Sequence, residues 1–263
     1  MGKPLKEWDI SINYGIKTGF NDAFIISGEK RMELINEDPR SEEIIRPILR
    51  GRDIKRYGYE FADLWLIATF PAKHYDIDKY PAIKKHLLSF GKKRLAQTGE
   101  KNIDGIDGND ARKKTSNKWF ETQDSISYWD DFSKPKIMYP NMTKYLPFYY
   151  DTNGFFQNDK SFMITGACIA YLTTFLNSSL FKFCFLDNFP ELLGDTRELR
   201  KIFFDKIPVK KITLDQNKQF EAVVNDIQRE YSEQKAILID SMIFDIYGLT
   251  QKEREQIGYI KIL

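Results

Sequence analysis

The apolar segment ACIAYLTTFLNSSLFKFCFL, at residues 167–186, constrains the fold more than any other part of the sequence. It is long enough for a helix that crosses a bilayer. Four polar residues interrupt it, namely Asn177, Ser178, Ser179 and Lys182. Because such groups are costly among lipid tails and can be satisfied inside a protein, we expect one helix buried in a large hydrophobic core, and no membrane partner.

The composition agrees with a globular protein that has such a core. Of the 263 residues, 42% are hydrophobic, 14% aromatic and 30% charged, which argues against a disordered chain. Cys168 and Cys184 lie in the apolar segment, so we expect buried, reduced thiols and no disulfide framework. The N-terminal residues MGKPLKEWDI lack the apolar stretch of a secretory signal, and the expected location is cytoplasmic.

Positive charge is concentrated in two regions of a chain that is nearly balanced as a whole, with 40 Lys and Arg against 38 Asp and Glu. Residues 84–118 hold ten basic and four acidic side chains, a net charge of +6. Residues 46–56, RPILRGRDIKR, hold five basic residues and Asp53, a net charge of +4. Either run alone is often a solvated face, but two together favour an anionic polymer as partner.

Hydrophobic periodicity predicts a mixture of strands and helices. Strands are expected within 8–27, on either side of a loop at 15–21, and at 63–70, 135–140, 147–151, 154–158 and 161–165, with an extended stretch at 202–212. Helices are expected within 28–51, broken at Pro39, capped near Ser41 and ended by Gly51, and at 80–97, 167–186 and 214–240. A last short helix follows Thr250, which forms a capping box with Glu253. The predicted division is a main domain at 1–212 and a helical appendage at 213–263 packed on it.

No catalytic or metal-binding pattern is evident. His74 and His86 lack Cys or carboxylate neighbours at metal-ligand spacing, and the glycine turns lack the Lys-Ser/Thr ending of a phosphate loop. Glu233 and Lys235 resemble part of a nuclease triplet, but on a helix residues two apart diverge by about 200°. We therefore expect a solvated helix at that point, and a chain that is not itself an enzyme.

Several phrases in order resemble one protein family. They are GIKTGFNDAFII (15–26), IIRPILRGRDIKRY (44–57), WLIATFP (65–71), DIDKYPAIKKHLL (76–88), FSKPKIMYPNM (132–142), FLNSSLFKF (175–183) and FDKIPV (204–209), followed by IDSMIFDIYGLTQKEREQI. The sequence is similar to the TaqI-like C-terminal specificity domain of adenine-specific DNA methyltransferases and type IIG restriction-modification enzymes. The resemblance covers nearly the whole chain.

The resemblance implies a mixed α+β target-recognition domain, with a twisted, mostly antiparallel sheet flanked by helices and a C-terminal helical segment. It implies double-stranded DNA and the methyltransferase domain of the parent enzyme as partners. The glycine-rich loop and Asn-Pro-Pro-aromatic motif of that catalytic domain are absent from the sequence, so S-adenosylmethionine is expected only there and this chain is expected to hold no cofactor. A fragment of a longer enzyme is the favoured interpretation. The alternatives are a free-standing specificity subunit, and a structural spacer whose basic patches bind an acidic protein.

The two basic regions supply the candidate DNA-binding residues. In the first, Arg52, Lys55 and Arg56 are predicted to line the groove for the phosphate backbone. The alternative is a structural (scaffold) or interdomain role, with Asp53 pairing to Arg50 or Arg56. In the second, the polar loop at 98–118 and the residues before it carry the side-chain types that contact phosphates and fork onto base edges. The predicted contacts there are Lys92, Lys93, Arg94, Arg112, Lys113, Lys114, Asn117 and Lys118, with Gln97, Asn102 and Asn109 as further base readers. The alternative is a disordered insertion.

Aromatic residues offer a weaker hypothesis. Side chains of this kind can stack on a base or wedge a base step, although in strands they more often belong to a core. The candidates are Trp119, Tyr128, Trp129, Tyr139, Tyr145 and Tyr149.

Overall fold

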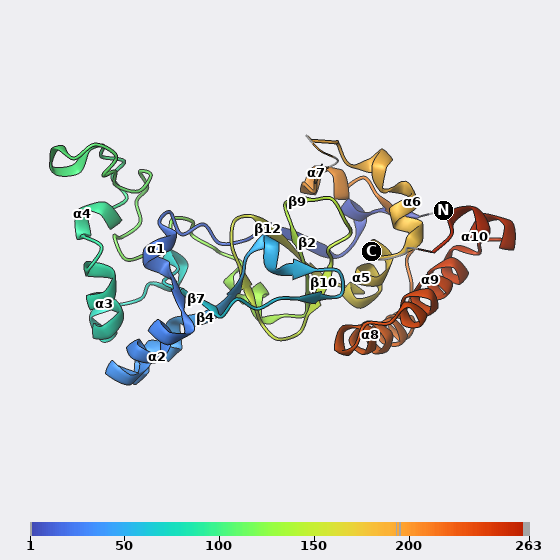
Figure 1. Ribbon diagram of the computed structural model, residues 1–263, viewed down its shortest axis with the longest axis horizontal. Coiled ribbons are helices and arrows are strands. Elements are labelled where there is room, and N and C mark those ends of the chain that lie inside the picture. Colours follow the sequence, from blue (N-terminus) through green and yellow to red (C-terminus); the bar gives the residue numbers. More distant parts are fainter. Residues whose placement is uncertain (1, 193, 195, 260–263) are drawn as a thin grey trace.

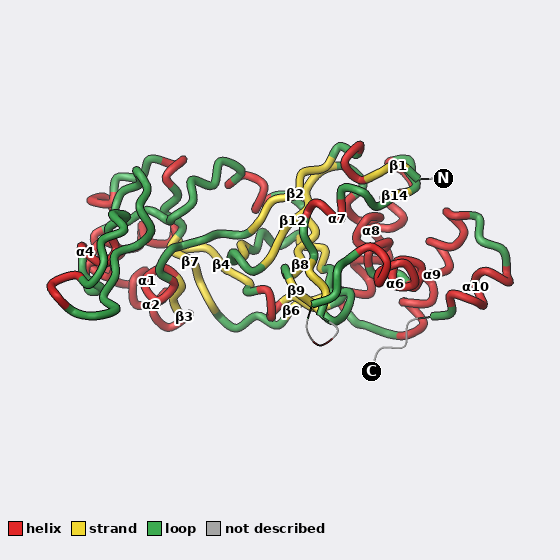
Figure 2. The backbone as a smooth tube through the Cα atoms, turned by 90° about the horizontal axis from the view of Figure 1, so that it is seen from above, coloured by secondary structure: helices red, strands yellow, loops and turns green. Residues whose placement is uncertain are grey.

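Strands occupy the middle of an elongated molecule and helices lie at both ends (Figure 1). The computed structural model describes residues 2–192, 194 and 196–259. Viewed from above, the same order holds, with α1, α2 and α4 at one end and α6, α8, α9 and α10 at the other (Figure 2). The expected mixed α+β class with mostly antiparallel sheets is confirmed.

The first sheet has the strand order β10–β8–β12–β2, and its strands are antiparallel. Their bounds are β2, Ile10–Tyr14; β8, Lys136–Pro140; β10, Tyr149–Asp151; and β12, Ser161–Gly166. Ile12 pairs with Ile164, which pairs in turn with Ile137, so the three side chains share one buried face.

The second sheet has the order β11–β4–β7–β3, with β11 parallel to β4 and the other pairs antiparallel. Its strands are β3, Ile25–Ser27; β4, Ile45–Leu49; β7, Leu64–Ile67; and β11, Phe156–Gln157. Since β10 ends at Asp151 in the first sheet and β11 begins at Phe156 in the second, the chain crosses between the sheets within a few residues.

Three short two-stranded pairs complete the strands: β1 (Lys3–Pro4) with β14 (Pro208–Val209), β5 (Ile54–Lys55) with β6 (Gly58–Tyr59), and β9 (Met142–Thr143) with β13 (Arg197–Glu198).

Helices at one end pack on the second sheet and form the first core with it. They are α1, Asn21–Phe24; α2, Gly28–Glu37; α3, Pro81–Leu88; and α4, Lys92–Leu95. The first core buries Phe24, Leu34, Ile48, Leu66, Ile83 and Phe132, among others. Short 3-10 helices lie at Leu5–Glu7, Pro39–Ile44, Gly51–Asp53, Pro71–Lys73, Ile77–Lys79, Ile103–Gly105 and Trp129–Ser133.

Helices at the other end lie on the side of the first sheet. They are α5, Ile169–Leu176; α6, Ser179–Asn188; α7, Lys201–Phe204; α8, Leu214–Arg229; α9, Glu233–Tyr247; and α10, Gln251–Ile257. The helices α5 to α9 form the second core with the sheet, and α10 buries no residue in it. Phe220, Val224 and Ile227 of α8 are buried in this core together with Tyr171 of α5. Within the C-terminal helical segment, α8 and α9 are therefore part of the second core. The capping box between Thr250 and Glu253 is confirmed at the start of α10.

The prediction of one helix at 167–186 is wrong, because the helix ends at Leu176 and a new one begins at Ser179. Ser178 caps the second helix by accepting a hydrogen bond from the Phe181 N–H. The Asn177 side chain turns back to the Phe148 backbone, accepting from its N–H at 3.2 Å and donating to its carbonyl at 2.7 Å. The polar residues therefore break the helix. The prediction that both cysteines are buried is also wrong, since Cys184 is exposed on α6 and Cys168 is half-buried.

The prediction of a helix from Ser41 to Gly51 is wrong as well. Asp38 caps a short 3-10 helix that ends at Ile44, and β4 follows immediately. Pro47 lies within β4, and a proline has no N–H for the interior of a helix. The 214–240 helix is divided at Ser232 into α8 and α9. The 202–212 stretch begins in α7 and is extended only at β14.

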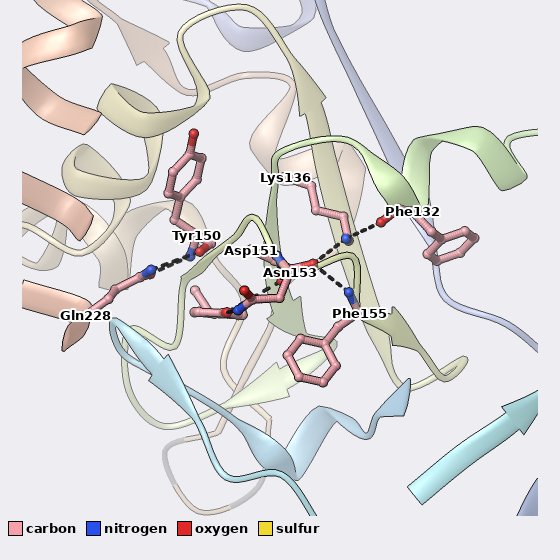
Figure 3. A network of polar contacts seen from close by, with 8 residues as sticks. Phe132, Lys136, Tyr150, Asp151, Asn153, Phe155 and Gln228 are labelled. Carbon is pink, nitrogen blue, oxygen red and sulfur yellow. Dashed lines mark hydrogen bonds and ion pairs between the residues drawn. The ribbon is translucent and has the colours of Figure 1, made fainter. Parts of the chain in front are cut away.

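A buried ion pair lies where the chain passes between the two sheets (Figure 3). Lys136 of β8 and Asp151 of β10 pair with no exposed side-chain surface, and the Lys136 ammonium also donates to the Phe132 carbonyl at 2.6 Å. Asp151 in turn accepts from the Phe155 N–H at 3.0 Å. In the same view, Gln228 of α8 pairs with both backbone groups of Tyr150 at 2.9 Å, which fastens the helical segment to β10.

Candidate nucleic-acid interface

The first basic region folds into a tight turn at Gly51–Asp53. Asp53 is buried and accepts from the Arg50 Nε at 2.9 Å and Nη2 at 2.8 Å, so the expected local pair forms with Arg50. Burial raises the pKa of Asp53, but the hydrogen bonds and charge of Arg50 outweigh it and the net shift is downward. Gly51 is required here because a Cβ would lie 2.7 Å from the Lys160 carbonyl oxygen. The turn neutralises Arg50 and leaves Arg52 and Lys55 exposed.

Arg56 takes part in the scaffold of the second core. Its Nε and Nη2 atoms donate to the Asn177 carbonyl at 3.2 and 2.7 Å, at the break between α5 and α6. Its guanidinium also lies 5.1 Å from the centre of the Tyr57 ring. These contacts correspond to the scaffold alternative for this residue, and Arg52 and Lys55 are the exposed cations of the region.

Arg52 and Lys55 line a depression of about 380 Å³ between the turn and the β8–β9 segment. Its other lining residues are Gly51, Ile54, Pro140, Asn141, Met142, Thr143, Tyr145, Pro147 and Lys160. Lys160 adds a third cation, which sequence reasoning missed because Lys160 lies about a hundred positions away in a short turn between strands. Each of two cations has an acidic neighbour, Lys55 with Glu60 at 3.3 Å and Lys160 with Asp159 at 3.4 Å. Such exposed pairs contribute little and exchange readily.

The second basic region is an ordered loop, held at its base by Arg112. This side chain is only 4% exposed. Its guanidinium donates to the carbonyls of Leu95, Thr18, Glu121 and Trp119 at 2.7–2.8 Å. Burial lowers the pKa of Arg112 to about 10, which leaves it charged at neutral pH. Gln97 is buried beside it and donates to the Glu121 carbonyl at 3.1 Å. The geometry gives Arg112 and Gln97 a structural role in this loop.

Other predicted residues of this region are engaged within the loop. Lys93 pairs with Asp104 at 2.5 Å, and Arg94 donates to the Asn109 side chain at 2.6 Å. The Asn117 amide donates to the Gln123 carbonyl at 2.8 Å. Within residues 84–118, the exposed cations that make no ion pair with the described part of the chain are Lys92, Lys113, Lys114 and Lys118.

The structure brings Lys92 and Lys118 together, although they lie far apart in sequence. Both line a second depression, of about 660 Å³, with Lys84, Trp119, Asp76 and Asp78 among its other residues. Lys92 lies 5.9 Å from the centre of the Trp119 ring. Figure 1 places α4 at one end of the molecule and β9, which borders the first depression, nearer its middle. Of the predicted cations, Arg52 and Lys55 therefore belong to a first basic centre and Lys92 and Lys118 to a second, while Lys113 and Lys114 line neither depression.

The aromatic candidates divide clearly by exposure. Tyr139 and Tyr149 are buried, as expected for strand residues, and the Tyr128 hydroxyl donates to the Tyr14 carbonyl. Trp119 and Trp129 are half-buried beside lysines. Tyr145 differs from all of these because 78% of it is exposed, at the edge of the first depression.

Within residues 2–192, 194 and 196–259, no three His, Cys, Asp or Glu residues are grouped so that they could hold a metal ion. None of the helices described there combines the length and apolar character needed to span a membrane.

Comparison with known proteins identifies one family. The model of the TaqI-like C-terminal specificity domain matches residues 46–209, which is more than half of the chain and includes both basic regions. No curated protein sequence matches this chain.

Two solved structures share the fold over 94% of this chain. One is the type IIL restriction-modification enzyme MmeI in complex with DNA, with a TM-score of 0.60 and 13% sequence identity over 34% of its chain. The other is the type IIG restriction endonuclease BpuSI, with a TM-score of 0.53 and 12% identity over 32% of its chain. This chain thus spans about a third of the length of each.

Proposed function

The chain belongs to the family of TaqI-like C-terminal specificity domains, and from that membership we propose that it reads a short sequence of double-stranded DNA for a restriction-modification enzyme. The observation that carries the proposal is the family match over residues 46–209, within which the exposed cations of both basic centres lie. Contacts to phosphates position such a domain, and contacts to base edges specify the sequence.

We propose that the exposed cations make the phosphate contacts. They are Arg52, Lys55, Lys92, Lys113, Lys114 and Lys118. Lys93 and Arg94 can join them if they exchange their partners in the loop, because their contacts are near the surface. In this proposal Arg56, Arg112 and Asn117 do not contact DNA themselves. They hold the turn and the loop that carry the contacting residues.

In this proposal, the catalytic steps are carried out by other domains of an adenine-specific methyltransferase or type IIG enzyme. The sequence has neither the glycine-rich loop nor the Asn-Pro-Pro-aromatic motif of such a methyltransferase domain. We therefore assign S-adenosylmethionine to that domain, no cofactor and no catalysis to this chain, and the cytoplasm as the place of action.

A free-standing specificity subunit would need an assembly surface on the C-terminal helices. Of the predicted apolar stripe, Phe220, Val224 and Ile227 are buried within the chain itself, whereas Tyr231 and Leu238 are 43% and 52% exposed. The part of the stripe on α8 therefore offers no assembly surface, and dimerisation of the chain through Tyr231 and Leu238 is the result that would favour the separate subunit. The spacer alternative differs in its partner, since it predicts salt-sensitive binding to an acidic protein domain and none to DNA.

The test is fluorescence anisotropy of the chain with a pool of random duplexes, followed by sequencing of the retained DNA. If about six phosphates are contacted, the affinity falls about 10³-fold between about 50 and about 200 mM salt. An enriched short motif in the retained fraction is the expected result. Absence of binding at the lower salt concentration would reject the proposal and favour the spacer.

A further inference from the structure

Two exposed apolar side chains lie at the first depression, where the proposed function places phosphate contacts. Tyr145 is 78% exposed and Met142 is 55% exposed, and both line the depression with Arg52, Lys55 and Lys160. An isolated exposed apolar residue needs no explanation. Here, however, two line the same depression as three cations.

The backbone that carries Tyr145 is held in place. Thr143 accepts from the Tyr145 N–H at 3.0 Å and donates its hydroxyl to the Tyr145 carbonyl at 2.9 Å. The next residue, Leu146, is buried in the second core, and Met142 pairs with Glu198 across β9 and β13. Tyr145 therefore projects from a turn that is fixed on both sides, which lowers the entropy lost when it binds a partner.

The depression combines an apolar floor with a cationic rim. Ile54, Pro140 and Pro147 line it as buried apolar residues, and Arg52, Lys55 and Lys160 line it as exposed cations. The acidic neighbours Glu60 and Asp159 are held in surface pairs at 3.3 and 3.4 Å, which a phosphate can replace. Such a surface is complementary to a nucleic acid, where apolar base faces lie between charged phosphates.

We propose that Tyr145, supported by Met142, contacts a base step of the bound duplex at a position where the DNA is distorted. The Tyr145 ring stacks on an exposed base face, while Arg52 and Lys160 neutralise the flanking phosphates. Apolar wedges of this kind bend a duplex and discriminate sequences by how easily a step is unstacked. The inference rests on the proposed function and adds a residue that reads DNA shape.

The experiment uses the duplex most strongly retained from the random pool, with 2-aminopurine placed at one position at a time as a reporter of base stacking. Wild type is compared with Tyr145→Ala, with Tyr145→Phe, which keeps the ring, and with Tyr231→Ala, an exposed tyrosine between α8 and α9. Urea unfolding of each variant checks that the fold is intact.

We expect wild type to change the reporter signal at one step. We expect Tyr145→Ala to lose that change and to bind about tenfold more weakly, with an unaltered dependence on salt. Tyr145→Phe and Tyr231→Ala should behave like wild type. If Tyr145→Ala binds as tightly as wild type and keeps the reporter signal, the inference is wrong and the proposed function stands. If wild type itself does not bind DNA, the proposed function fails first.

Discussion

Arg112 organises the longest loop of the molecule from a single buried position. The guanidinium presents several N–H donors in one plane, and here they reach the carbonyls of Leu95, Thr18, Glu121 and Trp119. A lysine offers its donors from one point and does not match this geometry. The neighbouring Lys113 and Lys114 are exposed as a result. Within three consecutive basic residues, the arginine thus serves the scaffold and the two lysines face solvent.

Replacing Arg112 should destabilise the protein strongly. In Arg112→Met the buried carbonyls lose their donor, and we expect the free energy of unfolding to fall by about 3 kcal/mol. Urea unfolding measures this change. Lys113→Met is the matched control, since its side chain is exposed and its loss should change stability by less than about 0.5 kcal/mol. Equal effects of the two substitutions would refute the structural role of Arg112.

His86 should make stability depend on pH. Burial lowers its pKa, against the opposing effect of the Ala23 carbonyl oxygen 3.0 Å from its Nε2 atom. The unfolded chain therefore takes up a proton near the ordinary pKa of 6.5 while the folded chain does so only at lower pH. It follows that this contribution to stability is present above that pH and is lost as the pH falls. Urea unfolding at about pH 7.5 and about pH 5.5 should show a smaller pH dependence in His86→Gln than in wild type. An identical dependence in both would contradict the expectation.

At the scale of elements, the sequence predicts strands better than helix limits. The strands β8, β10, β11 and β12 lie where alternation and flanking Pro or Gly residues indicate them. The helix expected up to Gly51 is instead β4, because this segment pairs with strands on both sides and buries Ile45 and Ile48. In the sequence, only Pro47 argues against a helix there. Spacing alone does not separate a buried strand from a buried helix.

The candidate site was predictable only in part, for a related reason. The exposed cations Arg52, Lys55, Lys113 and Lys114 follow from local charge, as does the pair between Arg50 and Asp53. Lys160 and Tyr145 join the first depression only through the pairing of distant strands. The Arg112 guanidinium is held by carbonyls from three separate segments, at Thr18, at Leu95 and at Trp119 and Glu121, which no local sequence pattern indicates.

The loop at 98–118 should contribute to DNA binding through its exposed lysines. Deleting 98–117 would also remove Arg112, so the double variant Lys113→Gln/Lys114→Gln is the sharper test. If each lysine neutralises one phosphate, the slope of log affinity against log salt should become shallower by about 2. Anisotropy titrations at several salt concentrations provide the slopes.

The control for this variant is Lys218→Gln/Lys252→Gln, which removes exposed lysines from α8 and α10. The control should keep the wild-type slope. If both double variants change the slope equally, the loop has no special part in binding.

At the scale of the whole molecule, two hydrophobic cores meet at a small junction between the sheets. Leu49, Ile54, Met138, Tyr149 and Phe155 form a separate cluster there, drawn from strands and turns of both sheets. The buried pair of Lys136 and Asp151 lies beside it. Burial lowers the pKa of Lys136 and the Asp151 carboxylate raises it, so the charged form depends on its partner. The relative position of the two basic centres depends on this junction.

Removing the charge of one partner of this pair should destabilise the protein more than removing the charges of both. In Asp151→Asn the Lys136 ammonium is left buried without a counter-charge, and the free energy of unfolding should fall by about 3–5 kcal/mol. In Lys136→Met/Asp151→Asn no unpaired buried charge is left at this position, and the Asn oxygen still accepts from the Phe155 N–H. Urea unfolding should therefore find the double variant more stable than Asp151→Asn. A double variant that is less stable than the single one would refute this account of the junction.

The central claim, that this chain reads a DNA sequence, is tested most directly by the affinity for a selected duplex and for copies with one base pair of the motif changed. Both are measured at the same salt concentration, so that the phosphate contribution is equal. We predict that a change within the motif weakens binding between about 5-fold and about 150-fold, while a change outside it has no effect. Equal affinity for the selected duplex and all of its altered copies would contradict the claim.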